Sequence, residues 1–372
     1  MKVFITGGSG FIGQRVVQRL VAQGHDVYGL TRSSQGAQII ESLGATSIIG
    51  GFDDKRAMKL GMSGSDVVIH MGAMNRLGET NWRQMEVINV AGTRTVIEMA
   101  QDMSVPKIIY TSTVAVYGDT QGIMYDETAR PSIPTQSHFA RTKWHAHFDV
   151  VQPMIAAGAP IIVLMPGLGY GPGDPGLIGE LMSRFHANEL PFPVLPGPDT
   201  MVTFAHADDI ADGIILGMER GKIGESYILA GPAVSFGEMV DFWSRLTGRP
   251  KPRIRINGSL IRPLIPLLDT INAFFPLGSV FSAEAMGSLG GTFMASGKKA
   301  KEELGWQNRS MQAGMLDTFN AIQLSQQQRP RRVFHTKNIL RFIAGAIILL
   351  ILYRLIFKNR GKFPEESNPG DV

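Results

Sequence analysis

The feature that most constrains the fold of this chain is a glycine-rich turn close to its first residue. An apolar run, KVFIT (residues 2–6), leads into GGSGFIG (residues 7–13) and then into the amphipathic stretch QRVVQRLVAQG. A strand, a glycine turn and a helix in this order let the main chain approach a diphosphate closely. The helix N-terminus supplies free N–H groups and the positive end of a dipole. The sequence therefore predicts a dinucleotide site with contacts from Gly7, Gly10, Phe11, Ile12 and Gly13.

Composition narrows the classes of protein that remain. The chain has 372 residues, of which 44% are hydrophobic and 18% charged, enough for about two domains with a buried core. It has no cysteine, which excludes cysteine nucleophiles, Fe–S clusters and cysteine-bound zinc, and we expect no metal site. The net charge of +4 arises at the C-terminal end, because nine basic and three acidic residues follow position 328. The first 328 residues carry a net charge of −2. We therefore expect no nucleic-acid partner.

Up to residue 165, short β-rich runs alternate with longer helix-like stretches. This alternation is typical of βαβ units, and it predicts an α/β fold with a Rossmann-type, doubly wound parallel sheet. The predicted strands are Val3–Thr6, Val27–Thr31, Ser47–Gly50, Val67–Met71, Lys107–Thr111 and Ile161–Met165, and the longer predicted helices are Gly10–Gln23, Asn81–Met103 and His138–Ala157.

The composition changes after Pro166, where proline and glycine become frequent. A strand–helix–strand pattern returns at residues 202–230. We assign residues 1–165 and 202–232 to the dinucleotide-binding domain. Residues 166–201 and 233–322 form a smaller, mostly helical substrate lobe in this interpretation. A cleft for a small-molecule substrate is expected at the carboxyl ends of the strands, under the loop from Gly167 to Pro198 and the lobe from Ala233 to Gly305.

The C-terminal end carries a candidate membrane segment. Residues 339–357 are apolar except for Arg341 and Arg354 near the ends, and as a helix they would span about 28 Å, close to a hydrocarbon core of about 30 Å. A basic linker (323–338) precedes the segment and a polar tail (358–372) follows it. The alternatives are a helix lying on a membrane surface and a helix docked on the protein. Since no signal peptide is evident, we expect a single-pass C-terminal anchor with the globular part in the cytosol.

The end of the second predicted strand bears on the choice of cofactor. Sites that prefer NAD usually have an acid at this point to bind the adenosine ribose, whereas this chain has Thr31 and Arg32, followed by two serines. A guanidinium beside hydroxyl groups suits the 2′-phosphate of NADP. We therefore expect NADP in preference to NAD, with Thr31 and Arg32 in contact with it. The alternative is that Arg32 is only a solvated surface residue.

Further motifs resemble those of the extended short-chain dehydrogenase/reductases, in the NAD-dependent epimerase/dehydratase family. TGGSGFIG resembles the family's TGxxGxxG, and the resemblance extends over residues 1 to about 320. The segments GESYILAG and GGTFMASGKKAKEELGW are most similar to the dihydroflavonol-reductase-like branch. DVVIHMGA (66–73), NVAGT (89–93), IYTSTVAVYG (109–118), Pro166 and HADD (206–209) resemble motifs of the cofactor site, the active-site strand and the substrate loop. The resemblance implies cofactor contacts from Gly72, Ala73, Asn89, Lys143 and Pro166.

The resemblance also implies a catalytic set of Ser/Thr, Tyr and Lys, and one member is missing here. Thr113 corresponds to the Ser/Thr and Lys143 to the lysine, but the position four residues before Lys143 is Phe139, which has no ionisable group. Two other positions depart from the family pattern: Gly51 stands where an aspartate that contacts adenine is usual, and Met165 where an arginine is common.

Three interpretations remain open. In the first, the protein is an NAD(P)-dependent oxidoreductase or epimerase that uses another acid, such as a nearby tyrosine, His138 or water. Its substrate would carry a hydroxyl or carbonyl group and be sugar, sterol-like or lipid-linked, and the apolar tail favours a lipophilic one. In the second, it is a redox-silent NADP(H)-binding sensor, scaffold or membrane-complex subunit. In the third, the motif is aligned in the wrong register. A homodimer is compatible with each.

Overall fold

A computed structural model describes residues 1–75, 81–134, 137–189, 194–196, 200–252, 254–256, 282 and 291–327 of the chain. The larger part of it is built on a sheet of seven strands that all run parallel. Each strand predicted from the sequence matches an observed strand to within a residue at either end. In spatial order the strands are β10 (Ser226–Leu229), β6 (Ile161–Pro166), β5 (Ile108–Thr111), β4 (Val67–His70), β1 (Lys2–Thr6), β2 (Asp26–Thr31) and β3 (Thr46–Ile49).

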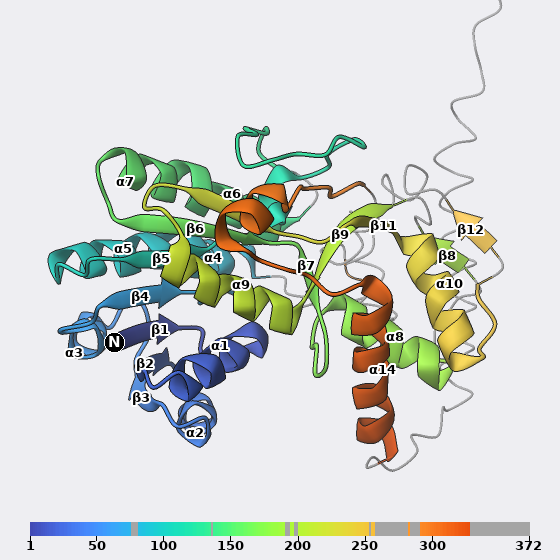
Figure 1. Cartoon of the computed structure of the whole chain (residues 1–372), viewed down its shortest axis with the longest axis horizontal. Helices are drawn as coiled ribbons and strands as arrows, with labels where there is room; N and C mark the ends of the chain where they lie inside the picture. The colour runs from blue at the N-terminus through green and yellow to red at the C-terminus, as the bar shows by residue number, and fades with distance from the viewer. Residues whose placement is uncertain are drawn as a thin grey trace, which may run out of the picture.

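Helices cover both faces of this sheet, as the alternating pattern predicted (Figure 1). Alternate residues of each strand point to opposite faces, so that each face has its own apolar core. One face packs against α1 (Phe11–Ala22), α2 (Ser34–Ser42) and α9 (Ala207–Arg220). The other packs against α3 (Lys55–Met62), α5 (Gly92–Asp102) and the helical run that contains residues 145–151.

The strand order reverses at β1, which pairs with β2 on one side and with β4 on the other. Connections therefore leave β1 and β4 toward opposite faces, and the loops after the two strands diverge. In open α/β sheets, ligands bind at such a reversal, beyond the carboxyl ends of the strands. The glycine turn directly follows β1, so the fold places it at this point.

Two long helices predicted from the sequence contain π-helical segments. The first comprises α4 (Trp82–Glu86), η1 (Val87–Ala91) and α5, and the second comprises α6 (His138–Trp144), η3 (His145–Val151) and α7 (Gln152–Ala156). A π-helical segment inserts one extra residue into the helical repeat and turns the following side chains, and such segments are frequent at functional sites. Asn89 lies within the first of these segments, and Lys143 lies in α6, shortly before the second.

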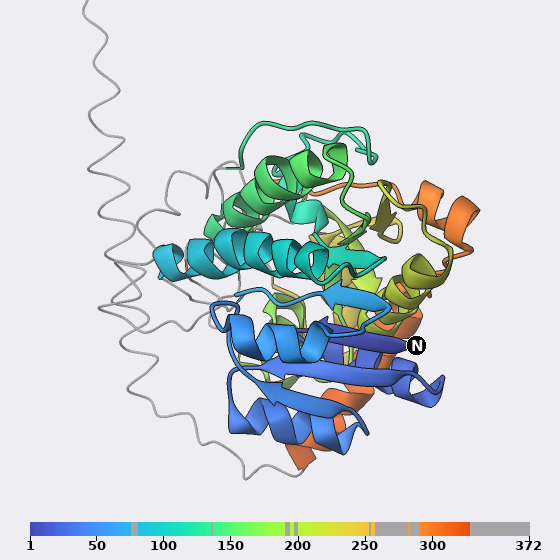
Figure 2. The same ribbon diagram turned by 90° about the vertical axis from the view of Figure 1, so that its left-hand side faces the viewer.

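A second lobe lies beside the end of the sheet (Figures 1 and 2). It contains a three-stranded sheet in the order β11 (Ala233–Ser235), β9 (Met201–His206) and β7 (Leu168–Tyr170), in which β11 is antiparallel to β9. Large side chains from three helices form its core, among them Phe185, Trp243 and Met315. These helices are α8 (Leu177–Ala187), α10 (Phe236–Thr247) and α14 (Met311–Gln327), and the short strands β8 (Val194–Pro196) and β12 (Ile254–Ile256) pair alongside. A π-helical turn, η6 (Ala300–Leu304), packs against α9.

The candidate membrane segment, residues 339–357, lies outside the described residues, as do the linker from residue 328 and the tail. Within the part that is described, no helix combines the length and the apolar character needed to cross a bilayer.

Candidate functional site

The glycine turn after β1 is shaped by close main-chain contacts. Gly7 has φ +78°, and a Cβ on it would lie 2.8 Å from the main-chain nitrogen of Gly72. A Cβ on Gly13 would collide with the carbonyl oxygen of Gly7, which also accepts a hydrogen bond of 3.0 Å from the Gly10 N–H. Only glycine fits positions 7 and 13, because each faces main chain that cannot move away. The turn therefore brings Gly7, Gly10, Phe11, Ile12 and Gly13 together at the start of α1, as the sequence predicted.

The N-terminus of α1 has no acidic residue in its first turn and no side-chain cap, since its N-cap residue is Gly10. The first N–H groups of a helix have no partner within it. An uncapped N-terminus beside a close-fitting glycine turn suits an anionic ligand such as a diphosphate.

A buried hydrogen-bonded chain supports the neighbouring edge of the sheet. Thr6 Oγ1 accepts from the Gly72 N–H at 3.1 Å and lies 2.7 Å from His70 Nδ1. On the other side of the ring, His70 Nε2 lies 3.0 Å from Thr93 Oγ1, and that hydroxyl donates to the Asn89 carbonyl at 2.7 Å. Burial, with a smaller effect of the nearby Lys143 charge, lowers the pKa of His70 to about 3. We therefore assign a neutral ring that accepts from Thr6 at Nδ1 and donates to Thr93 from Nε2.

Asn89 is held entirely by the protein. Its Oδ1 accepts from the Met74 N–H at 2.7 Å, and its Nδ2 donates to the Met74 carbonyl and to Thr142 Oγ1 at 3.2 and 3.0 Å. Both N–H groups are thus used. Through its bonds to Met74, Asn89 orients the segment that carries Gly72 and the exposed Ala73.

At the end of β2, the two predicted residues lie in different surroundings. Thr31 is buried, and its Oγ1 packs against Gly36 in the first turn of α2. Arg32 is exposed and has no hydrogen-bond or ion-pair partner among the described residues. Ser33 caps α2 by accepting from the Gly36 N–H at 3.1 Å, which leaves its own hydroxyl hydrogen able to donate. A cation and a hydroxyl are therefore available where the adenosine ribose of a bound dinucleotide would lie.

Gly51 stands where relatives usually have an aspartate, and here the side chain of Asp53 occupies the space next to Gly51. A Cβ on Gly51 would collide with Asp53 Oδ1, so a carboxylate lies where a side chain of residue 51 would begin.

Lys143 is buried beneath the carboxyl end of β5. Its Nζ donates to the Tyr110 hydroxyl at 3.0 Å and to the Thr111 carbonyl at 2.9 Å. Burial lowers the pKa of Lys143 to about 7, so the amine exchanges a proton near neutrality. The neighbouring Thr111 Oγ1 is buried and has no hydrogen-bond partner among the described residues. An unsatisfied hydroxyl beside a lysine at this edge indicates room for a polar group of a ligand.

Thr113 lies just after Thr111 and caps a short 3₁₀ helix, η2 (Val114–Tyr117). Its Oγ1 accepts from the Ala115 N–H at 3.2 Å and is half-buried. The hydroxyl hydrogen of Thr113 remains free to donate to a substrate oxygen. Pro166, at the end of the neighbouring strand β6, is buried in the same edge.

The tyrosines of this edge are engaged within the protein. The Tyr117 hydroxyl donates to the Asp126 carbonyl at 2.9 Å and lies 3.7 Å from Met165 Sδ. Burial raises the pKa of both Tyr117 and Tyr110 well above the usual value. The idea that a nearby tyrosine replaces the missing acid therefore gains no support from either side chain. His138 is exposed, with Nδ1 2.8 Å from Arg141 Nη2, and its ring stacks on Trp82.

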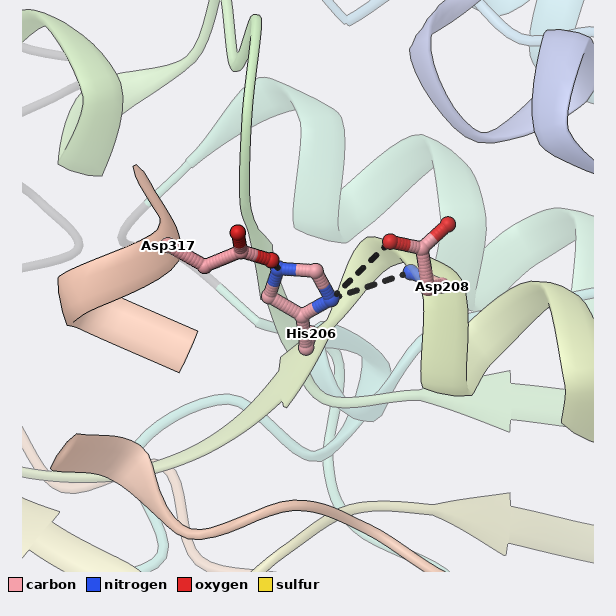
Figure 3. A group of neighbouring side chains, drawn as sticks. All are labelled: His206, Asp208 and Asp317. Carbon is pink, nitrogen blue, oxygen red and sulfur yellow. Dashed lines mark hydrogen bonds and ion pairs between the residues drawn. The ribbon is translucent and has the colours of Figure 1, made fainter. Parts of the chain in front are cut away.

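The HADD segment forms a cluster that sequence reasoning interpreted only in part. Aspartates such as Asp208 and Asp209 at the start of a helix are common caps, but the N-cap of α9 is His206, whose Nδ1 accepts from the Asp208 N–H at 3.3 Å. The buried His206 ring lies between two carboxylates, with Nδ1 3.5 Å from Asp208 and Nε2 3.6 Å from Asp317 of α14 (Figure 3). No local pattern predicts Asp317, because it is 111 positions away in the sequence.

Arginines surround this cluster. Arg15 and Arg19 of α1 each lie 3.2 Å from Asp208, while Arg309 pairs with Asp209 at 2.9 Å and with Asp317 at 3.3 Å. The two nitrogens of His206 face different carboxylates, and each of these carboxylates already pairs with an arginine. The cluster is thus an ion-pair network that joins α1, α9 and α14, and it carries no argument for a cation.

A cavity of about 680 Å³ lies next to the network, and His206 and Arg309 belong to its lining. Its walls come from β9, β11, one face of α10 and residues 308–312, and they carry both acids and bases. None of the predicted cofactor residues lines it.

Comparisons with known proteins agree with the motifs. A model of the NAD dependent epimerase/dehydratase family matches residues 3–230. A 4-hydroxy-2-methyl-3-oxo-4-farnesyl-3,4-dihydroquinoline-1-oxide ketoreductase of Stigmatella aurantiaca is 30% identical over 62% of this chain and 68% of its own length. Sterol demethylase protein B of Methylococcus capsulatus is 24% identical over 85% of this chain and 97% of its own. The crystal structure of gox2253 superposes with a TM-score of 0.75 at 28% identity, over 87% of this chain and 98% of that one.

Proposed function

Because the chain belongs to the NAD-dependent epimerase/dehydratase family, we propose that it binds a nicotinamide dinucleotide at the carboxyl edge of its seven-stranded sheet. The observation that carries this proposal is the glycine turn, where main chain packs closely against Gly7 and Gly13 beside an uncapped helix N-terminus. Gly7, Gly10 and Gly13 would hold the diphosphate, and Lys143 and the unpartnered Thr111 hydroxyl would face the nicotinamide half.

Within this proposal, NADP is preferred to NAD. Arg32 is an exposed cation without a partner among the described residues, and Ser33 has a hydroxyl hydrogen to give. A guanidinium binds a phosphate through two parallel hydrogen bonds. Binding of the Arg32 guanidinium to the 2′-phosphate costs little free energy, because Arg32 does not have to leave an existing ion pair.

The reaction that the site supports best is oxidoreduction or epimerisation at a hydroxyl or carbonyl carbon. A bound nicotinamide supplies or accepts the hydride. Thr113 Oγ donates a hydrogen bond to the substrate oxygen, and Lys143, with its pKa near 7, holds the proton that this oxygen gains or loses. In this scheme the lysine takes over the proton from the tyrosine that Phe139 replaces.

A second function is favoured by one specific observation. Phe139 cannot transfer a proton, and the two tyrosines nearest in sequence to Thr113 are bonded to other groups. A protein with this arrangement would bind NADP(H) tightly without catalysing a reaction of any substrate. In that case it would act as a redox-silent sensor, scaffold or subunit.

We infer further that the substrate is lipophilic and that the chain is attached to a membrane through residues 339–357, with its globular part in the cytosol. Two relatives are named for a farnesylated quinoline oxide and for a sterol, and the apolar segment would bring the cleft close to such compounds. Flotation of the full chain with liposomes, compared with a chain ending at residue 338, tests the attachment. Equal behaviour of the two would refute it.

One experiment separates the two functions. Calorimetry measures NADPH binding, and a panel of sterol, quinone-like and nucleotide-sugar carbonyls measures turnover, in the wild type, Lys143→Met and Phe139→Tyr. Turnover by the wild type that is lost in Lys143→Met supports the enzyme. Tight binding without turnover, with turnover gained only in Phe139→Tyr, supports the silent binder.

A further inference from the structure

Arg15 joins three segments of the chain that are distant in sequence. Its Nη1 donates to the Phe11 carbonyl at 2.8 Å, its Nη2 donates to the Pro172 carbonyl at 2.7 Å, and its Nε lies 3.2 Å from Asp208. The guanidinium also lies over the Phe11 ring, 4.6 Å from the centroid. Only 18% of the side chain is exposed, so these contacts leave it little freedom.

The Pro172 carbonyl belongs to the turn between β7 and α8 of the second lobe. The turn is closed by a hydrogen bond of 3.0 Å from the Asp174 N–H to the Gly171 carbonyl. Asp174 then accepts from the N–H groups of Gly176 and Gly179, at 2.7 and 2.8 Å, and so fixes the start of α8. Holding Pro172 therefore holds the entry to a helix that supplies part of the core of the lobe.

Phe11 belongs to the glycine turn. Its peptide unit forms part of the helix N-terminus that would receive the diphosphate, and its carbonyl is the group that Arg15 binds. A ligand that draws this peptide toward itself also shifts the carbonyl. A planar guanidinium with two donors set in fixed directions passes such a shift on, whereas a flexible ammonium does not.

We propose that Arg15 is a positioning residue through which dinucleotide binding at the glycine turn fixes the turn at residues 171–174 and the start of α8. The inference rests on the proposed cofactor site and extends it to the substrate side. It predicts that the cofactor orders part of the second lobe without touching it.

Arg19 is a matched control, because it lies one helical turn further along α1 and shares one partner. It binds Asp208 at 3.2 Å and Asp212 at 2.6 Å, and its remaining bonds go to the carbonyls of Arg15 and Asp208. Its described contacts do not include the 171–174 turn. Replacing Arg19 disturbs the same ion-pair network but leaves the bond to Pro172 in place.

The test is hydrogen–deuterium exchange of the full chain with and without saturating NADP, in the wild type, Arg15→Lys and Arg19→Lys. In the wild type, NADP should slow exchange of the Gly176 and Gly179 amides at least about fivefold. Arg15→Lys should still bind NADP, within roughly tenfold of the wild-type affinity, but lose this protection, whereas Arg19→Lys should keep it. Arg15→Gln, which retains one donor group, serves as a second variant if Arg15→Lys does not fold.

Equal protection in the Arg15 and Arg19 variants would overturn the inference, as would a wild type that binds NADP without slowing these amides. Both results leave the cofactor site standing. A folded wild type that binds neither NADP nor NAD would overturn the proposed function and this inference together.

Discussion

The two ends of the candidate site differ in how their polar groups are used. At the glycine turn, the helix N-terminus is uncapped and Arg32 has no partner in the described part of the chain, so groups that can bind a ligand are left free. Around β5 and α6, Lys143 is bonded to Tyr110 and Tyr117 to the Asp126 carbonyl. The first region leaves polar groups available to a ligand, while the second satisfies most of its polar groups internally.

This difference separates two requirements that usually occur together. Binding a dinucleotide needs free donors and a close main-chain approach, which the turn retains. Moving a proton needs a titratable group that reaches the substrate, and in the proposed enzyme that task falls to Lys143 because Phe139 cannot do it. The predictions below test this contrast, in order of the expected effect on cofactor affinity.

The strongest effect is expected at Gly7. Gly7 and Gly24 share nearly the same backbone, with φ +78° and +77°, but a Cβ on Gly24 meets nothing within 4 Å. Gly24→Ala should lose about 1 kcal/mol of stability from the left-handed backbone. Gly7→Ala should lose more than this, because its Cβ also meets the main chain of Gly72. Gly7→Ala should in addition weaken NADP binding roughly a hundredfold by calorimetry, the size of about two hydrogen bonds to a charged group. Equal affinity in the two variants would contradict the role of the turn.

Lys143→Met should weaken NADP binding about tenfold and yet stabilise the protein in the absence of ligand. Burial lowers the pKa of Lys143 from 10.5 to about 7, so the unfolded chain binds more protons between these values and wild-type stability rises with pH across this range. The variant should therefore be more stable by a few kcal/mol at pH 6 and lose that advantage as the pH approaches 10. Urea unfolding at several pH values measures this. An advantage that does not change with pH would show that the lysine is not buried as a charge.

Arg32→Ala should reduce NADP affinity by about tenfold and leave NAD affinity unchanged, because only NADP carries the 2′-phosphate. Arg94→Ala, at another exposed arginine on α5, is the control and should alter neither. If Arg32→Ala changes both affinities equally, the arginine does not select the cofactor.

Phe139→Tyr should have the smallest effect on binding, less than about twofold, because the half-buried ring is only extended by a hydroxyl. Its effect on turnover is the informative part. Restoration of a phenol one helical turn before Lys143 should raise a proton-limited rate by about a hundredfold or more. An unchanged rate in an active protein would mean that proton transfer does not limit it.

The sequence predicted the sheet well because its strands are short apolar runs with sharp ends, and because the glycine turn defines the first βα unit. The sequence also predicted that Thr113 and Lys143 belong to one site, and the structure places both near the carboxyl end of β5. It did not reveal the partners that set their chemistry. Tyr110 binds Lys143 across 33 positions, and Arg15 binds the Pro172 carbonyl across 157, so no local pattern carries either contact.

The N-cap of α9 likewise depends on contacts that are distant in sequence. Aspartates at the start of a helix are common caps, and the sequence alone does not show that arginines from α1 and from the segment before α14 bind them instead. Burial raises the pKa of Asp208, but Arg15 and Arg19 outweigh it and hold that pKa below its usual value. This charge pairing depends on tertiary packing. The roles given to the individual site residues remain predictions.

Calorimetric titration of the full wild-type chain with NADP tests the central claim most directly. We expect saturable binding of one NADP per chain in the micromolar range and weaker binding of NAD. Binding of NADP should be roughly a hundredfold weaker in Gly7→Ala and unchanged in Gly24→Ala. A folded protein that takes up neither dinucleotide would contradict the account.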